Sequence, residues 1–159
     1  MAILTHLDLS SAFDTTDHCI LLHRLQSLYG ISGTVLSWLE FYLTGRTQTV
    51  TANDQLSRLA DVSFGVPKGS VLGPILFIFH SAPLSSLIET DSVSNQFFVD
   101  DTQLLHFRPP DQIHATVLII KTRNADVKTW LTQNKLKLND SIKGKETLGF
   151  MSTETIKAY

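Results

Sequence analysis

The stretch from Asn95 to Phe107, NQFFVDDTQLLHF, constrains the fold of this chain more than any other. Apolar runs on both sides of Asp100 and Asp101 are typical of two strands joined by a tight corner. Adjacent carboxylates repel each other and lose hydration on burial, so the pair is costly inside a folded protein. The stretch therefore predicts a β-hairpin with two negative charges at its corner.

The rest of the chain predicts both helices and strands. Asp17 can cap a helix over residues 17–29, and Gly30 can end it. Asp111, which follows two prolines, can cap a long amphipathic helix over residues 111–134. Helices are also expected at 33–45 and 71–88; strands are expected at 3–9, 46–52, 56–64, 135–138 and 147–151. This order favours an α+β fold with helices on one face of an antiparallel sheet.

Composition indicates one ordinary domain. The 159 residues are 43% hydrophobic and 18% charged, so the chain can bury a core. A net charge of −2 leaves no electrostatic footprint for nucleic acid, so any such contact must be local or depend on metal ions or further segments. Cys19 is the single cysteine, which excludes an intrachain disulfide and favours a reducing compartment. Its apolar helical surroundings favour a small buried side chain.

No segment is typical of export or of a membrane. The N-terminus MAILTHLDLSS has no basic region, and His6 and Asp8 interrupt its apolar run, so it is not a signal peptide. The most apolar stretch, VLGPILFIF, is too short to span a bilayer. We therefore expect an intracellular protein without a membrane partner, in a compartment that no targeting signal specifies.

A third carboxylate gives the hairpin aspartates a chemical purpose. Asp8 ends the first predicted strand, and Asp100 and Asp101 occupy the hairpin corner. Carboxylates on adjacent strands can bracket two hard divalent ions such as Mg²⁺, which would cancel their repulsion. The simpler interpretation is a solvated turn, because aspartate is common in turns and short motifs often match by chance. The three residues alone favour the solvated turn.

The sequence around these aspartates resembles the reverse transcriptase domain of non-LTR (LINE-type) retrotransposons. LDLSSAFDTTDHCILLHRL, GVPKGSVLGPILF and FVDDTQLL occur in the order and at the spacing of that family. GISGTVLSWLEFYLTGRTQTV and WLTQNKLKLN resemble it as well, so the match covers residues 3–139. The resemblance implies a palm-like α+β fold and an RNA-directed DNA polymerase that acts on an RNA template, a DNA primer and dNTPs.

The resemblance also assigns roles to individual residues. Asp8 matches the metal ligand of motif A, and Asp100, with Asp101 beside it, matches motif C. These residues would be catalytic and would bind two Mg²⁺ ions, with Mn²⁺ as a substitute. Phe13 falls where a bulky aromatic side chain excludes a ribonucleotide, although its position is equally typical of core packing.

Motifs B and D depart from the family. Lys68 replaces the usual glutamine that helps to position the nucleotide and template, and a solvated loop lysine is an equal alternative. Gly65 and Gly69 would let the backbone approach the nucleotide or template closely. By resemblance, Lys145 is the candidate general acid of motif D, which would protonate the pyrophosphate leaving group. The surrounding sequence DSIKGKETLGF departs from the family's pattern, and an exposed lysine is the simpler interpretation.

The resemblance begins at motif A, so the family's fingers segments and its thumb are expected to be incomplete. We expect a partial reverse transcriptase palm segment over residues 1–139 and a degenerate or poorly ordered tail over residues 140–159. Without fingers and thumb, most phosphate contacts are lost, and the chain alone is expected to be inactive. The alternative is a non-catalytic retroelement remnant that acts as a binding module or has no function.

Overall fold

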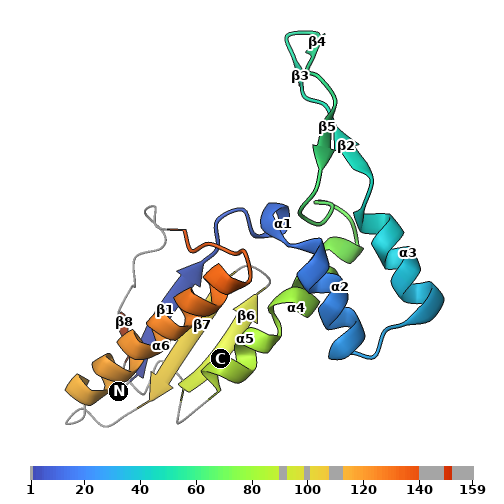
Figure 1. Cartoon of the computed structure of the whole chain (residues 1–159). Helices are drawn as coiled ribbons and strands as arrows, with labels where there is room; N and C mark the ends of the chain where they lie inside the picture. Colours follow the sequence, from blue (N-terminus) through green and yellow to red (C-terminus); the bar gives the residue numbers. More distant parts are fainter. Residues whose placement is uncertain (1, 90–92, 99–100, 108–112, 140–148, 152–159) are drawn as a thin grey trace. The chain divides into compact units, whose positions relative to one another are not determined.

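The computed structural model describes residues 2–89, 93–98, 101–107, 113–139 and 149–151 (Figure 1). The chain divides into two compact units, and each has its own packing. The sheet unit is formed by Met1–Ala12 together with Ser81–Tyr159, and the helical unit is formed by Phe13–His80. Helices accompany small antiparallel sheets throughout, so the expected α+β class is confirmed.

The sheet unit contains a four-stranded antiparallel sheet with the strand order β6-β7-β1-β8. The strands are β1 (Ala2–Asp8), β6 (Val93–Phe98), β7 (Asp101–Phe107) and β8 (Gly149–Met151). The predicted hairpin is confirmed as the β6–β7 pair, and its corner, residues 99–100, lies outside the described residues. Part of the strand expected at 147–151 is present as β8, which pairs with β1. The proposed boundary at residue 139 stays a prediction.

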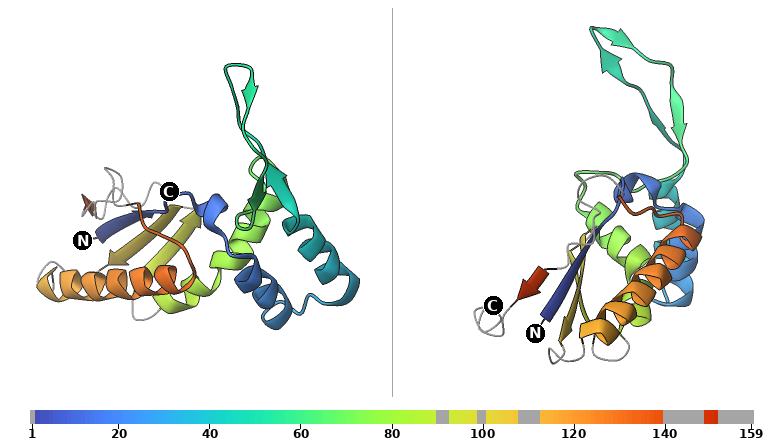
Figure 2. Two further views of the ribbon diagram at one scale, coloured as in Figure 1. Left: turned by 45° about the horizontal axis from the view of Figure 1, so that its top comes forward. Right: turned by 90° about the vertical axis from the view of Figure 1, so that its left-hand side faces the viewer.

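Two helices cover one face of this sheet. Helix α5 (Pro83–Ile88) and helix α6 (Ile113–Gln133) lie on the same side of the strands in both views of Figure 2. Their buried side chains include Leu84, Ile88, Ile120, Val127 and Leu131. The three from α6 recur at helical spacing, which confirms the predicted amphipathic face. The expected N-cap Asp111 lies outside the described residues.

The single helix expected over residues 71–88 is wrong. The segment forms helix α4 (Leu72–Ser81) and then α5, with Ala82 between them. Pro83 is the first residue of α5, where its missing N–H costs nothing, but inside a continuous helix it would remove one hydrogen bond and clash with an earlier carbonyl. Pro74 is tolerated near the start of α4 because the first amides of a helix have no intrahelical partner, so its missing N–H costs nothing there.

The helical unit packs helices α2 (His18–Ser27) and α3 (Gly33–Leu43) against each other and against α4. Its core cluster consists of Leu21, Leu25, Leu39, Leu43, Val66 and Leu76. The predicted cap is confirmed, because the Asp17 carboxylate accepts a hydrogen bond from the Ile20 amide at 3.0 Å. Cys19 is exposed on α2, so its predicted burial is wrong. The buried leucines of α2 are Leu21 and Leu25, four residues apart on one face, and Cys19 lies off that face.

A hairpin extends from the helical unit (Figure 1). Its turn residues Asn53 and Asp54 have φ values of 50° and 59°, as a tight two-residue hairpin turn requires. The two expected strands are each interrupted, giving the pairs β2 (Arg46–Gln48) with β5 (Ala60–Val62) and β3 (Thr51–Ala52) with β4 (Gln55–Leu56). Between the pairs, the Ser57 hydroxyl accepts the Val50 amide at 2.9 Å in place of a ladder carbonyl.

The strand expected at residues 135–138 is reduced to a single bridge between Leu138 and Leu9 in the sheet unit. Lys135 has a φ of 61°, so the chain leaves the end of α6 in a turn shortly before this bridge. Among the helices that the structure describes, none combines the length and the apolar character needed to cross a membrane.

Candidate active site

The register of β1 and β7 brings two aspartates together. Asp8, the last residue of β1, lies directly opposite Asp101, the first residue of β7. Asp101 is also paired with Phe98 across the hairpin. Positions directly opposite each other in an antiparallel pair share a face of the sheet, and like charges there are destabilising. The ladder thus juxtaposes positions 8 and 101, as the sequence predicts, while Asp100 lies outside the described residues.

Asp8 is held by Asn139, a residue that the sequence prediction missed. The Asn139 side-chain amide donates from Nδ2 to Asp8 Oδ2 at 2.8 Å. The Asn139 backbone amide donates to the Asp8 carbonyl at 2.9 Å. Asn139 ends the WLTQNKLKLN segment that resembles the family, and this was the one signal that could have drawn attention to it.

The carboxylate of Asp8 at this edge of the sheet is a ligand that fits a hard divalent cation. Carboxylate oxygens are the ligands that Mg²⁺ takes in proteins. The Asp8 carboxylate accepts a hydrogen bond from the neutral Asn139 side chain at Oδ2, and this bond leaves the negative charge of Asp8 in place. The part of the chain that the structure describes contains no group of three or more His, Cys, Asp or Glu side chains able to hold a metal. That part excludes Asp100, so the proposed three-carboxylate set stays a prediction.

In the helical unit, the turn at Gly65 fits against the backbone after Phe13. Gly65 has φ of +84°, and a Cβ atom there would lie 2.8 Å from the Phe13 carbonyl oxygen and 2.9 Å from Asp14 Cα. The Gly65 amide donates to the Thr16 carbonyl at 2.8 Å, and the Val66 amide donates to the Phe13 carbonyl at 2.7 Å. Only glycine satisfies both the backbone angle and the space.

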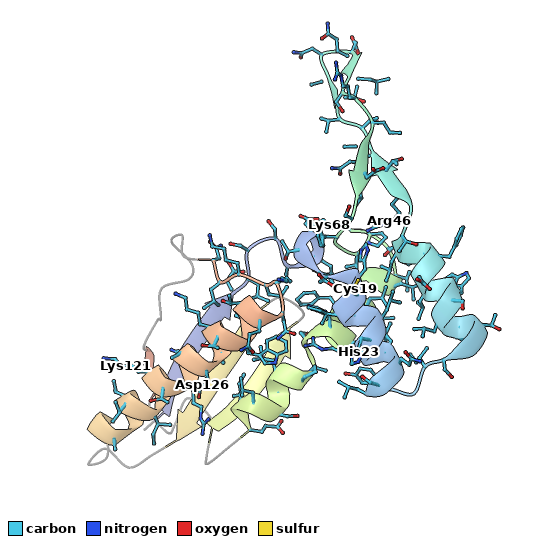
Figure 3. The ribbon with its side chains drawn as sticks, viewed as in Figure 1. Cys19, His23, Arg46, Lys68, Lys121 and Asp126 are labelled. Carbon is cyan, nitrogen blue, oxygen red and sulfur yellow. The ribbon has the colours of Figure 1, made fainter. Side chains whose placement is uncertain are left out.

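The Gly65 carbonyl is held by two side chains that the sequence prediction missed. The buried His18 ring lies with Nε2 at 2.8 Å from this oxygen and therefore donates to it. Arg46 donates to the same oxygen from Nη2 and to the Leu43 carbonyl from Nε at 3.0 Å. Arg46 thus connects the end of α3 and the base of the hairpin to the turn (Figure 3). No sequence pattern identifies a histidine or an arginine as a partner of a distant carbonyl.

Lys68 is engaged with an acidic neighbour. Its Nζ lies 2.6 Å from Asp14 Oδ2, and the two side chains are 61% and 52% exposed. The ion pair borders a hollow of about 750 Å³, which is lined by Arg46 and its strand neighbours, Val62 and residues 64–68. Gly69 has φ of +74°, but a Cβ there would meet no atom within 4 Å. Gly65 therefore needs glycine for both its backbone angle and its close backbone approach, whereas Gly69 needs it for its backbone angle. The predicted contact of Gly69 with nucleotide or template stays a prediction.

Phe13 packs on Phe77. The ring centroids are 5.3 Å apart and the planes are tilted by 32°, so the aromatic side chain has a packing role in the helical unit. Its predicted role in excluding ribonucleotides is not tested by this contact and stays a prediction. Lys145 lies outside the described residues.

Residues 2–149 match the reverse transcriptase (RNA-dependent DNA polymerase) family, and the chain belongs to that family. A curated relative, the RNA-directed DNA polymerase from the mobile element jockey of Drosophila funebris, is 36% identical over 78 residues. This alignment covers 49% of the chain and 8% of the relative. The likeness to a mobile-element polymerase confirms the predicted LINE-type reverse transcriptase segment.

Two solved structures share the fold. A telomerase from Candida albicans, solved with a fragment of telomeric RNA, superimposes with a TM-score of 0.64 at 16% identity, over 96% of this chain and 28% of its own. An apo telomerase from Candida tropicalis gives 0.67 at 14% identity, over 96% of this chain and 31% of its own. The palm-like α+β fold is thus confirmed. The chain spans less than a third of either structure.

Proposed function

We propose that this chain carries the metal-binding carboxylates of an RNA-directed DNA polymerase. The observation that carries the proposal is the β1–β7 register, which sets Asp8 opposite Asp101 in a member of the reverse transcriptase family. The two positions are far apart in sequence, so their juxtaposition requires the folded sheet. A solvated turn alone would not need Asp8 beside it.

Asp8, Asp100 and Asp101 are the proposed ligands of two Mg²⁺ ions, for which Mn²⁺ can substitute. When bound, such ions lower the pKa of a primer 3′-hydroxyl and stabilise the charge of the triphosphate. The protein supplies acceptor oxygens at fixed positions. The strand ladder fixes the backbone of Asp8 and Asp101, and Asn139 fixes one oxygen of Asp8.

The proposed substrates are an RNA template, a DNA primer and dNTPs. Support comes from the family, and from the Candida albicans telomerase, which is described in complex with RNA. Phe13, Lys68, Gly69 and Lys145 are the proposed contacts for nucleotide and template. Lys68 and Arg46 both border the hollow at the hairpin base, where a phosphate group would have to compete with Asp14 for Lys68 and with backbone carbonyls for Arg46.

Binding of Mn²⁺ tests the carboxylate site. Electron paramagnetic resonance detects free Mn²⁺, so a titration of the 159-residue chain gives its affinity. We expect Asp8→Asn to weaken binding at least about 10-fold, because a ligand charge is lost. Asp61→Asn, which removes an exposed carboxylate on β5, is the matched control and should leave the affinity unchanged. Equal affinities for wild type and Asp8→Asn would overturn the proposed site.

Primer extension tests the chemistry. We expect the isolated chain to extend no primer on a poly-rA template with Mg²⁺ or Mn²⁺, because its net charge of −2 offers little attraction for the nucleic-acid backbone. Extension that disappears on Asp100→Ala would overturn the expected inactivity and would confirm the polymerase at the same time.

The second candidate is a non-catalytic retroelement remnant that serves as a binding module. The Lys68–Asp14 ion pair favours it, because a lysine that stands in for the family's glutamine is engaged with a carboxylate. A chain that binds RNA in a gel-shift assay with the same affinity before and after Asp8→Asn, and that does not bind Mn²⁺, would fit this candidate.

A further inference from the structure

Asn139 reaches the proposed metal ligand from a separate segment of the chain. It follows the bridge between Leu9 and Leu138, beyond the end of α6. Its side-chain amide meets Asp8 Oδ2 at 2.8 Å, and its backbone amide meets the Asp8 carbonyl at 2.9 Å. Both donors therefore act on the same residue.

We propose that Asn139 is a positioning residue, which fixes the Asp8 carboxylate so that Oδ1 is the oxygen offered to a divalent cation. This inference rests on the proposed function, because it concerns the same carboxylate. A carboxylate without a donor rotates about its terminal torsion, which has a broad energy profile. A hydrogen bond to one oxygen restricts that rotation and selects the other oxygen for the ion.

The chemistry of an amide suits this role. A lysine or arginine at this position would also restrain the carboxylate, but its positive charge would compete with the metal for the same negative charge. The neutral Asn139 side chain donates without cancelling the charge of Asp8. Hydrogen bonds to metal-ligating carboxylates have this effect in other metal sites.

The side-chain bond is not needed to hold the two segments together. The Ser10 amide donates to the Lys137 carbonyl at 2.8 Å, and the Asn139 amide donates to the Asp8 carbonyl. Together with the Leu9–Leu138 bridge, these backbone contacts join the segments without the Asn139 side chain. The bond from Nδ2 to Oδ2 therefore acts on the orientation of the carboxylate.

The test compares Asn139→Ala with a matched control, Asn134→Ala. The Asn134 side chain donates from Nδ2 to the Trp130 carbonyl at 2.7 Å, so each substitution removes a side-chain amide donor within the sheet unit. We expect similar losses of thermal stability. For Mn²⁺ affinity, measured by electron paramagnetic resonance on the full chain, we expect Asn139→Ala to bind about 10-fold more weakly than wild type and Asn134→Ala to match wild type.

The outcomes separate this inference from the proposed function. If wild type binds Mn²⁺ and Asn139→Ala binds equally well, the positioning role is overturned and the carboxylate site stands. If wild type and all variants fail to bind Mn²⁺, the proposed site and the positioning role both fall. Asn139→Leu, which keeps the branched shape of the side chain without a donor, tests the same point if Asn139→Ala does not fold.

Discussion

The two units of this chain hold their functional segments in different ways. In the sheet unit, Asp8 and Asp101 meet through a long-range strand register. In the helical unit, the turn at Gly65 is fixed by a hydrogen bond that its amide donates, by hydrogen bonds that its carbonyl accepts, and by close backbone contact. The carboxylate edge is therefore specified by strand register, and the turn is specified by hydrogen bonds and close backbone contact with segments distant in sequence. Substitutions at the carboxylate edge should therefore change metal affinity, and substitutions at the Gly65 turn should change the free energy of unfolding.

Gly65→Ala should give the largest effect. The added Cβ would lie within 3 Å of the backbone of Phe13 and Asp14, and φ is +84°. We expect a loss of about 3 kcal/mol in the free energy of unfolding, measured by urea denaturation. Gly69→Ala is the control, because it has a similar φ and no atom near the Cβ; its loss should be about 1 kcal/mol. Equal losses at both positions would show that the close approach does not matter.

His18→Ala should have the next largest effect. It removes a donor from the Gly65 carbonyl in a buried site, for which we expect a loss of about 2 kcal/mol in unfolding free energy. Cys19→Ala, at an exposed neighbouring position on the same helix, should change stability by less than about 0.5 kcal/mol. A small effect of His18→Ala would mean that Arg46 alone suffices to hold the turn.

The Lys68–Asp14 ion pair should contribute least. Both side chains are more than half exposed, so a double-mutant cycle with Lys68→Ala and Asp14→Ala should give a coupling below about 1 kcal/mol. The coupling should decrease further in 1 M salt because exposed charges are screened. A coupling that is large and independent of salt would contradict the solvated geometry and would assign the pair a structural role in the turn.

The sequence predicted the elements of this fold better than their interruptions. Asp17 identified the start of α2, and the apolar runs on both sides of the aspartates identified the β6–β7 hairpin, because caps and strand patterns are local. The break before Pro83 was missed, although proline is a local signal, because an apolar helical pattern continued on both sides of it.

In the candidate site too, some residues were predicted from the sequence and others were not. Asp8 and its partner strand were predicted from motif spacing, which depends on the family resemblance. Asn139, His18 and Arg46 were missed, because each acts on a residue that only the folded chain brings near. Side chains that position other groups are not marked by a sequence motif with a fixed spacing, so their roles become visible only in the three-dimensional contacts.

The most direct test of the account is to locate the bound metal on the chain. Fe²⁺ can replace Mg²⁺ in oxygen-ligand sites, and with ascorbate and peroxide it cleaves the nearby backbone, so the fragment ends identify the residues around the ion. We predict cleavage near Asp8 and near the corner between β6 and β7, suppressed by excess Mg²⁺ and lost in Asp8→Asn. Cleavage elsewhere, or an unchanged pattern in Asp8→Asn, would contradict a metal site at this edge of the sheet.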